Sequence, residues 1–202
     1  MTIMLLENNL EMLTEYENYL NNHRVKEDRL ESLSILPYVA NMDLVQASNI
    51  NPDIVIDLIY ENMLNKGAVK AICTYLHPNF EEMLHYLMGT SSDFEAIVPL
   101  SVAKNMLTQA MDYKTEHPPK NKYFNIKPVI DEDLQIVLVV SKDKMLLGLT
   151  WFTGKFNKNC VLISHEPVVI DWAYTLYTEY DFIATKYLSL REIIIKKQQF
   201  IK

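Results

Sequence analysis

The stretch VKAICTYLHPNFEEMLHYLMGTSSDFEAIVPLS, residues 69–101, decides the fold. An apolar run over residues 69–76 has the length of a buried strand, and the His-Pro pair that follows opens a helix ending at Gly89. A second apolar run over 94–100 leads into another helix. Strands that alternate with helices at this spacing pair in parallel through right-handed crossovers. The stretch therefore predicts an α/β fold.

The alternation extends upstream, and a different pattern follows downstream. A helix that begins at Asn51-Pro52 has the capping residue and the proline typical of a helix start. After a proline-rich break at 117–119, apolar runs follow one another closely around a hairpin turn at 141–144, which predicts antiparallel strands in the same sheet. The expected architecture is a mixed, largely parallel sheet covered by helices. The further strands are expected at 44–48, 123–130, 134–140 and 145–152, and a last amphipathic helix at 166–188.

Residues 3–22 predict one further helix, because apolar side chains recur on one face at helical spacing. An isolated helix of this length is marginal in water. It therefore packs either on its own domain or against a second copy, and its spacing, close to a coiled-coil seam, is compatible with both. The predicted organisation is an N-terminal linker or dimerisation helix over 1–25, an α/β domain over 26–190 and a basic C-terminal helical tail over 191–202.

Charge and composition exclude several classes of protein. The chain of 202 residues has a formal net charge of -7, whereas a stand-alone nucleic-acid binder needs a basic face. The basic residues of the tail, such as Arg191 and Lys196, are interpreted as a solvated helix end. Cys73 and Cys160 form neither a disulfide framework nor a zinc motif. The sequence contains no apolar segment long enough to span a bilayer and no signal peptide pattern, so we expect a cytoplasmic protein without a membrane partner.

The sequence contains no recognisable catalytic motif. The four glycines are too far apart for a phosphate-binding loop. Ser164, His165 and Asp171 contain the atoms of a catalytic triad but lack the nucleophile elbow around the serine. His77 and His85 have no carboxylates at metal-ligand spacing. We therefore expect no enzyme activity, no catalytic residue, no bound metal and no cofactor.

Polar side chains follow both strands of the deciding stretch at the point where each strand ends. In a parallel α/β sheet, ligands bind outside the carboxyl ends of the strands. Each of these ends leads straight into a helix N-terminus, which favours an anion. His77 and Ser101 also have a second interpretation, because both are suited to capping a helix. We predict a ligand-binding crevice lined by Thr74, His77, Asn79, Ser101 and Lys104.

Aromatic residues at strand ends form a second candidate region. The pairs Trp151-Phe152 and Tyr123-Phe124 are able to floor an apolar pocket. They are equally able to pack in the core against the last helix, and the sequence leaves both interpretations open. Trp151 is included among the predicted ligand-binding residues.

The segment 134–180 carries a resemblance to a known family. Its motifs are MLLGL at 145–149, TGKFN at 153–157, VLIS at 161–164 and DWA at 171–173. Together they resemble the closing segment of the sensor domain in archaeal winged-helix regulators of the methanogenesis regulatory protein family. Upstream, the end of a strand at 46–48 and the YLHP motif at 75–78 resemble the same family in order and spacing. The likeness extends over about 5–188.

This resemblance implies that residues 26–190 are a sensor domain that binds an unknown small-molecule effector and forms a homodimer. Full-length members of the family place a winged helix-turn-helix before the sensor. The helix over 3–22 is too short for the three helices and wing that DNA reading needs. The resemblance therefore implies contact with DNA only through a winged-helix domain that is missing here.

The sensor domain also resembles a degenerate half of the phospholipase D fold. That enzyme class needs a His-x-Lys pair, because the histidine is the nucleophile that attacks phosphate. The comparable strand here reads Asn125-Ile126-Lys127, so the nucleophile is missing. A pocket without its nucleophile fits a binding role, although likeness of fold alone does not decide function.

The predicted function is the ligand-sensing domain of an archaeal transcriptional regulator. The expected effector is a charged metabolite held by His77, Ser101 and Lys104. Two alternatives remain open. One is a sensor-only interaction protein that modulates full-length regulators by heterodimerisation, and the other is a small hydrolase that uses Ser164 or His77.

Overall fold

The computed structural model describes residue 14 and residues 18–20, 35–64, 67–113, 120–121, 123–130, 134–151, 153, 155–184 and 188–200. Within these ranges the strands form one eight-stranded sheet in the order β1-β7-β6-β5-β2-β3-β4-β8. The strands are β1 Asp43–Gln46, β2 Ala68–Ile72, β3 Asp93–Pro99, β4 Phe124–Val129, β5 Ile136–Val140, β6 Met145–Leu149, β7 Cys160–Ser164 and β8 Leu188–Ser189.

The α/β class with a mixed sheet covered by helices is confirmed, but the expectation that most strands pair in parallel is wrong. β3 pairs in parallel with β2 and β4, and the other five pairs are antiparallel. The reason lies in the connections, because only two helices cross between neighbouring parallel strands. The strands β5, β6 and β7 return as a series of antiparallel neighbours beside β2, and β1 pairs with the last of them.

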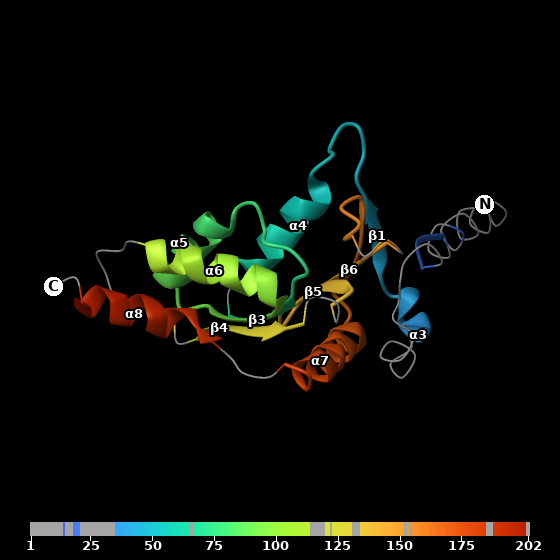
Figure 1. Cartoon of the computed structure of the whole chain (residues 1–202). Helices are drawn as coiled ribbons and strands as arrows, with labels where there is room; N and C mark the ends of the chain where they lie inside the picture. Colours follow the sequence, from blue (N-terminus) through green and yellow to red (C-terminus); the bar gives the residue numbers. More distant parts are fainter. Residues whose placement is uncertain are drawn as a thin grey trace.

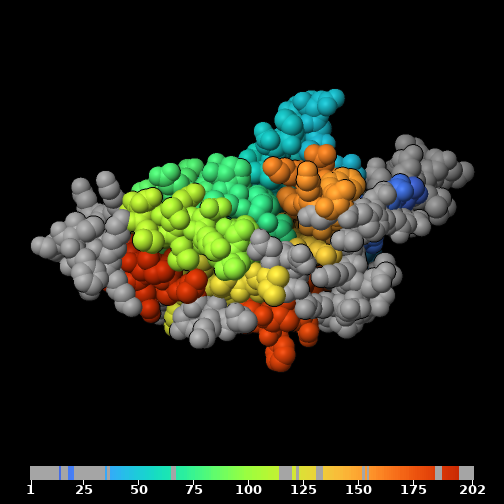
Figure 2. Space-filling view, viewed as in Figure 1, coloured from blue at the N-terminus to red at the C-terminus, as the bar shows by residue number. Residues whose placement is uncertain are grey.

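Helices cover both faces of the sheet (Figure 1). One face carries α4, α5, α6 and α8, and the opposite face carries α7 and the short α3. The helices are α3 Leu36–Val39, α4 Ile54–Met63, α5 Phe80–Gly89, α6 Leu100–Asp112, α7 Pro167–Asp181 and α8 Leu190–Phe200. Figure 2 shows α5 and α6 side by side on the surface of the face that carries α4, α5, α6 and α8.

Two hydrophobic cores lie on the two faces of the sheet, and neighbouring residues of one strand alternate between them. Ala71 packs in the core under α4, α5 and α6, whereas Ile72 packs in the core under α7. Strands that are buried on both faces read as continuous apolar runs rather than as alternating ones. Every residue of β5 and β6 is buried, so both strands can be recognised in the sequence as continuous apolar runs.

The predicted N-terminal helix lies mostly outside the described residues, but one of its side chains is well placed. Tyr19 is buried in the core under α7. Its hydroxyl accepts a hydrogen bond from the Leu149 amide at 3.0 Å and donates one to the Cys160 carbonyl at 3.3 Å. Burial, the largest of the contributing causes, raises the pKa of Tyr19. This residue therefore packs on its own domain, one of the two arrangements that the sequence left open.

The C-terminal part differs from the prediction in one respect. The helix expected over 166–188 ends at Asp181, and β8 then adds a two-residue strand to the edge of β4. The helix α8 follows and buries Leu190 and Ile194 in the core under α4, α5 and α6. In the part of the chain that the structure describes, no helix combines the length and the apolar character needed to cross a bilayer.

Candidate functional site

The ends of β2 and β3 lie at the same edge of the sheet, because these two strands are parallel neighbours. The chain leaves β2 at Ile72 and enters α5 at Phe80, and it leaves β3 at Pro99 and enters α6 directly. All five residues of the predicted crevice therefore follow these two strand ends. Their detailed environments nevertheless differ from one another.

His77 is used inside the protein. The residue is 5% exposed, and its ring stacks on Tyr60 with 5.2 Å between the ring centroids. Nδ1 accepts a hydrogen bond from the Asn79 amide at 3.1 Å, so Nε2 carries the proton and donates it to the Ile56 carbonyl at 3.2 Å. Burial lowers the pKa of His77 more than its other neighbours raise it. The neutral imidazole therefore connects α4 to the start of α5, and both of its nitrogens form hydrogen bonds.

Three of the other four residues of the predicted crevice lie on the surface. Asn79 precedes the first turn of α5, and Ser101 and Lys104 are exposed on α6. Ser101 does not cap α6 as the sequence suggested, because that helix begins at Leu100 and Pro99 occupies the cap position. Their role in ligand binding remains a prediction.

A group of buried polar atoms lies at the same end of the sheet. After β2 and Cys73 come Thr74 and Tyr75, and Gln135 directly precedes β5, the antiparallel neighbour of β2. Gln135 is only 8% exposed. Each has a buried side-chain oxygen without a hydrogen-bond partner among the described residues, namely Thr74 Oγ1, Tyr75 OH and Gln135 Oε1.

Aromatic side chains also lie at this end of the sheet. Tyr75 stacks on Phe156, with 5.2 Å between the ring centroids. Thr150 donates to the Gln135 carbonyl through both its amide and its hydroxyl, at 3.2 and 2.8 Å, so the next residue, Trp151, lies beside this strand end. Trp151 is 38% exposed. Burial raises the pKa of Tyr75, so its hydroxyl stays protonated and able to donate.

The predicted aromatic cluster is split by the sheet. Trp151 follows the end of β6, whereas Tyr123 precedes β4, and these positions lie at opposite ends of the sheet. Tyr123 is 58% exposed, and Phe124 is fully buried with its ring edge-on to Phe94. Phe152 lies outside the described residues. The sequence-based prediction therefore grouped residues from two separate regions, because the spatial order of the strands differs from their order in the chain.

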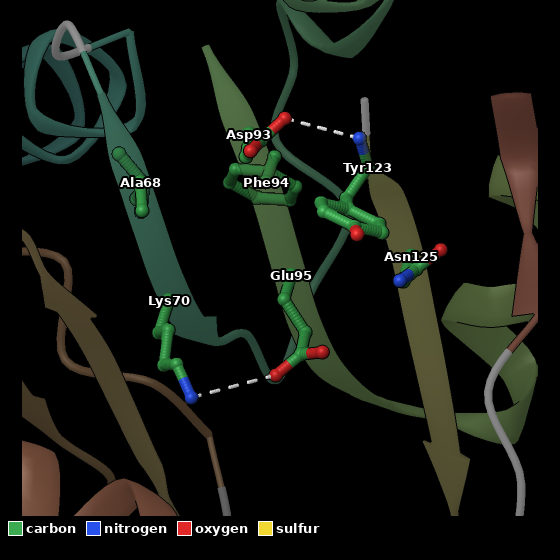
Figure 3. A pocket seen from close by; sticks show the side chains of 8 residues that line it. Ala68, Lys70, Asp93, Phe94, Glu95, Tyr123 and Asn125 are labelled. Atoms are coloured by element: carbon green, nitrogen blue, oxygen red, sulfur yellow. Dashed lines mark hydrogen bonds and ion pairs between the residues drawn. The ribbon is translucent and has the colours of Figure 1, made fainter. Parts of the chain in front are cut away.

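A pocket of about 300 Å³ lies at the end where Tyr123 is found (Figure 3). It is formed where β2, β3 and β4 begin. Figure 3 shows the side chains of Lys70, Glu95 and Asn125 along neighbouring strands, with Tyr123 beside Phe94. The complete lining is Ala68, Val69, Lys70, Asp93, Phe94, Glu95, Tyr123 and Asn125.

The charged groups of this pocket are matched within the protein. Glu95 contacts Lys70 at 3.7 Å and Lys127 at 3.3 Å and accepts a hydrogen bond from the Tyr177 hydroxyl at 2.9 Å. Lys127 also pairs with Asp181 at the end of α7. Burial opposes the charge on Lys127, but its hydrogen bonds and the attraction of both carboxylates outweigh burial and raise its pKa. Burial and the nearby Glu95 raise the pKa of Tyr177.

The residues considered for hydrolysis have other partners. The Ser164 hydroxyl donates to the Asn41 carbonyl at 2.6 Å and accepts from the Glu166 amide at 3.1 Å. His165 Nδ1 lies 3.0 Å from the Asp143 carbonyl. The serine hydroxyl thus forms its hydrogen bonds with backbone groups and not with the imidazole. Among the described residues, no three His, Cys, Asp or Glu side chains are grouped to hold a metal ion.

Residues 52–181 match the model of a family described as the methanogenesis regulatory protein FilR1, middle domain. The chain belongs to this family. The membership makes it a domain of a regulatory protein family, as the resemblance of its closing segment indicated. The match includes β2 to β7 and both candidate regions but ends before β8 and α8.

The fold is also similar to a solved structure, that of TrmBL2, described as an archaeal chromatin protein with a novel mode of DNA binding. The TM-score is 0.52 at 11% sequence identity, over 91% of this chain and 68% of that one. At this identity the likeness concerns the fold alone. A search of curated proteins found no match. The predicted relation to phospholipase D remains a prediction.

Of the residues at this end of the sheet, Thr74 and Trp151 are among the ligand-binding residues predicted from the sequence, whereas Tyr75 and Gln135 are not. Gln135 carried a signal, because it is a polar residue at the start of an apolar run whose other members are all buried. Tyr75 carried none, since a tyrosine at the end of a strand is typical of core packing. The pocket of Figure 3 was also missed, because it depends on three strands that are far apart in the sequence.

Proposed function

We propose that this chain is the effector-sensing domain of an archaeal transcriptional regulator, and that its effector binds where β2 and β6 end and β5 begins. The proposed contacts are Thr74, Tyr75, Gln135 and Trp151. Contact with DNA belongs, in this proposal, to a winged-helix domain of such a regulator and not to these residues. We further propose a cytoplasmic homodimer.

The observation that carries the proposal is the group of buried oxygens without partners. Leaving one buried polar group without a hydrogen bond costs about 1–3 kcal/mol. Three such groups at one strand end represent a substantial fraction of the roughly 5–15 kcal/mol that stabilises a domain. A ligand that forms hydrogen bonds with these oxygens would remove this cost. Binding would therefore stabilise the folded domain.

The pocket of Figure 3 is the weaker candidate for the effector site. Glu95 already pairs with Lys70 and Lys127, and Asp93 accepts a hydrogen bond from the Tyr123 amide, so a ligand has to compete with contacts that exist. At the strand end, the corresponding groups have no such partners to lose. Because fewer existing contacts compete with a ligand there, the strand end is the better candidate for the effector site.

The composition of the proposed site indicates the kind of effector. Its four side chains are all uncharged, and they offer hydroxyl donors, an amide oxygen acceptor and an indole ring. This favours a neutral polar molecule with hydroxyl or amide groups over the charged metabolite that Lys104 suggested. Asn79, Ser101 and Lys104 remain at the rim as secondary contacts of this proposal.

Fluorescence of Trp151 tests the proposal. The chain has two tryptophans, and Trp172 is buried under α7, so Trp172→Phe leaves Trp151 as the only reporter. Titration with a panel of nucleosides, sugars and small amides should change its emission for at least one compound. A flat response across the panel, together with no small molecule released from protein purified under native conditions, would overturn the proposal.

A matched pair of variants then locates the site. Thr74→Val removes one partnerless hydroxyl, whereas Thr175→Val removes a hydroxyl that is exposed on α7 and bonded to the Asp171 carbonyl. Thr74→Val should weaken binding roughly tenfold, as the loss of one good hydrogen bond does, and Thr175→Val should not. Equal affinities for both variants would place the effector elsewhere.

A further inference from the structure

A groove between α5 and α6 shares one lining residue, Asn79, with the regions described above. It consists of two adjoining hollows of about 380 and 480 Å³, each in the size range of small-molecule sites. They share the side chains of Glu81 and His85. The full lining is Glu81, Leu84, His85, Gln109, Asp112 and Tyr113 for the first and Asn79, Glu81, Glu82 and His85 for the second.

The groove is negative. Glu81, Glu82 and Asp112 line it, and the lining residues that the structure describes include no lysine or arginine. The last turn of α6 adds to this potential, because the final carbonyls of a helix carry partial negative charge and this turn contains no basic residue.

The charge of Asp112 does not stabilise the helix on which it lies. Glu81 and Glu82 lie in the first turn of α5, where carboxylates stabilise the helix dipole. Asp112 is the last residue of α6, where the dipole disfavours a carboxylate. Its position therefore weakens the helix while adding to the charge of the groove.

The groove also offers a hydrogen-bond acceptor and aromatic rings. Gln109 Oε1 is buried and has no hydrogen-bond partner among the described residues, so it is available to an N–H donor. The Tyr113 ring lies 4.7 Å from the His85 ring, measured between centroids. Aromatic faces attract cations that lie over them. These observations and the negative charge all indicate a ligand that is cationic and donates N–H bonds.

We infer that this groove binds a small linear polyamine. Its ammonium groups contact Glu81 and Asp112, and one N–H bonds to Gln109 Oε1. A metal ion fits less well, because among the described side chains no three carboxylate, imidazole or thiolate groups converge. The charges are spread along two helices, as an extended organic cation requires.

Calorimetric titration of the full chain with spermidine tests this inference. We expect one molecule bound per chain, with affinity at least fivefold lower for Asp112→Asn and for Glu81→Gln. The control is Glu166→Gln, which removes the same charge from an exposed site before α7. An equal loss in the control would mean that spermidine follows the overall charge of -7, and it would overturn the inference.

Two further measurements separate a specific contact from a charge effect. Gln109→Leu changes no charge, and it should also lower the affinity for spermidine at least fivefold. Asp112→Asn should bind less tightly yet have a higher melting temperature, because a carboxylate is removed from the helix end. Absence of heat with spermidine, or binding of a tetralysine peptide without binding of spermidine, would overturn the inference, the latter in favour of a basic protein segment.

Discussion

At the scale of single residues, His77 shows how a motif that predicts a ligand contact can serve the fold. A histidine before a proline at the end of a strand looked like part of an anion site. In the structure the ring is held by two backbone hydrogen bonds and by stacking on Tyr60. The physical reason is burial, which favours the neutral imidazole and lowers its pKa.

This lowered pKa predicts a dependence of stability on pH. Because the folded pKa lies below the unfolded value of about 6.5, the contribution of His77 is present above pH ~6.5 and is lost as the pH falls through the folded pKa. We expect the melting temperature of the protein to fall between pH 7.5 and 5. His77→Gln should be less stable at pH 7.5 and should show a smaller fall, and an unchanged slope in this variant would contradict the assignment.

Gly148 is a second residue whose environment is restrictive. A Cβ on this glycine would lie 2.4 Å from Cε2 of Phe156, the ring on which Tyr75 stacks. Gly148→Ala should therefore displace Phe156 and lower the free energy of unfolding by about 1–3 kcal/mol, as measured by urea denaturation. Gly89→Ala is the matched control, because its Cβ meets no atom within 4 Å. In the last position of α5, alanine should be neutral or stabilising.

At the scale of secondary structure elements, the N-terminal helix is the element that the sequence left undecided. Tyr19 holds part of it on the domain, since its hydroxyl bonds to backbone groups at the end of β6 and at the start of β7. This places the apolar face of that turn against the core under α7.

Tyr19→Phe tests this packing. It keeps the ring but leaves the buried Leu149 amide without its partner, so the free energy of unfolding should fall by about 1–3 kcal/mol. Tyr38→Phe provides the control, because Tyr38 is only half-buried and contacts Trp172 through its ring. If Tyr19→Phe were as stable as the unchanged protein, the N-terminal helix would not be bound to its own domain in solution.

At the scale of the whole molecule, charge sets an expectation for DNA. A chain with a net charge of -7 does not gain the counterion release that drives non-specific binding. We expect no shift of a duplex DNA fragment by this chain at physiological salt in a gel assay. A titration at low salt provides the control, and a clear shift at both salt concentrations would place a DNA-binding surface within these residues and contradict the proposed division of labour.

The proposed homodimer also belongs to this scale, and it stays a prediction. Sedimentation analysis across a range of concentrations distinguishes a dimer from a monomer. The result bears on how an effector acts, because a ligand shifts a regulator only if it binds two arrangements with different affinity.

The sequence by itself determined the α/β class, most strands and helices, and the family. It did so because these features are local or periodic: strands buried on both faces read as apolar runs, and helices carry stripes, proline starts and closing glycines. It also named Thr74 and Trp151 as candidate ligand-binding residues, but in two separate regions, and only the strand pairing places both at the same end of the sheet.

Only the tertiary structure decided how the strands pair and which polar groups meet. The insertion of β5, β6 and β7 beside β2 made antiparallel pairing the majority, and it placed Gln135 at the same end of the sheet as Tyr75, although the two are 60 positions apart in the sequence. The same insertion separated Trp151 from Tyr123. Contacts between distant segments depend on strand order, and strand order follows from which buried faces fit together, which the local pattern does not encode.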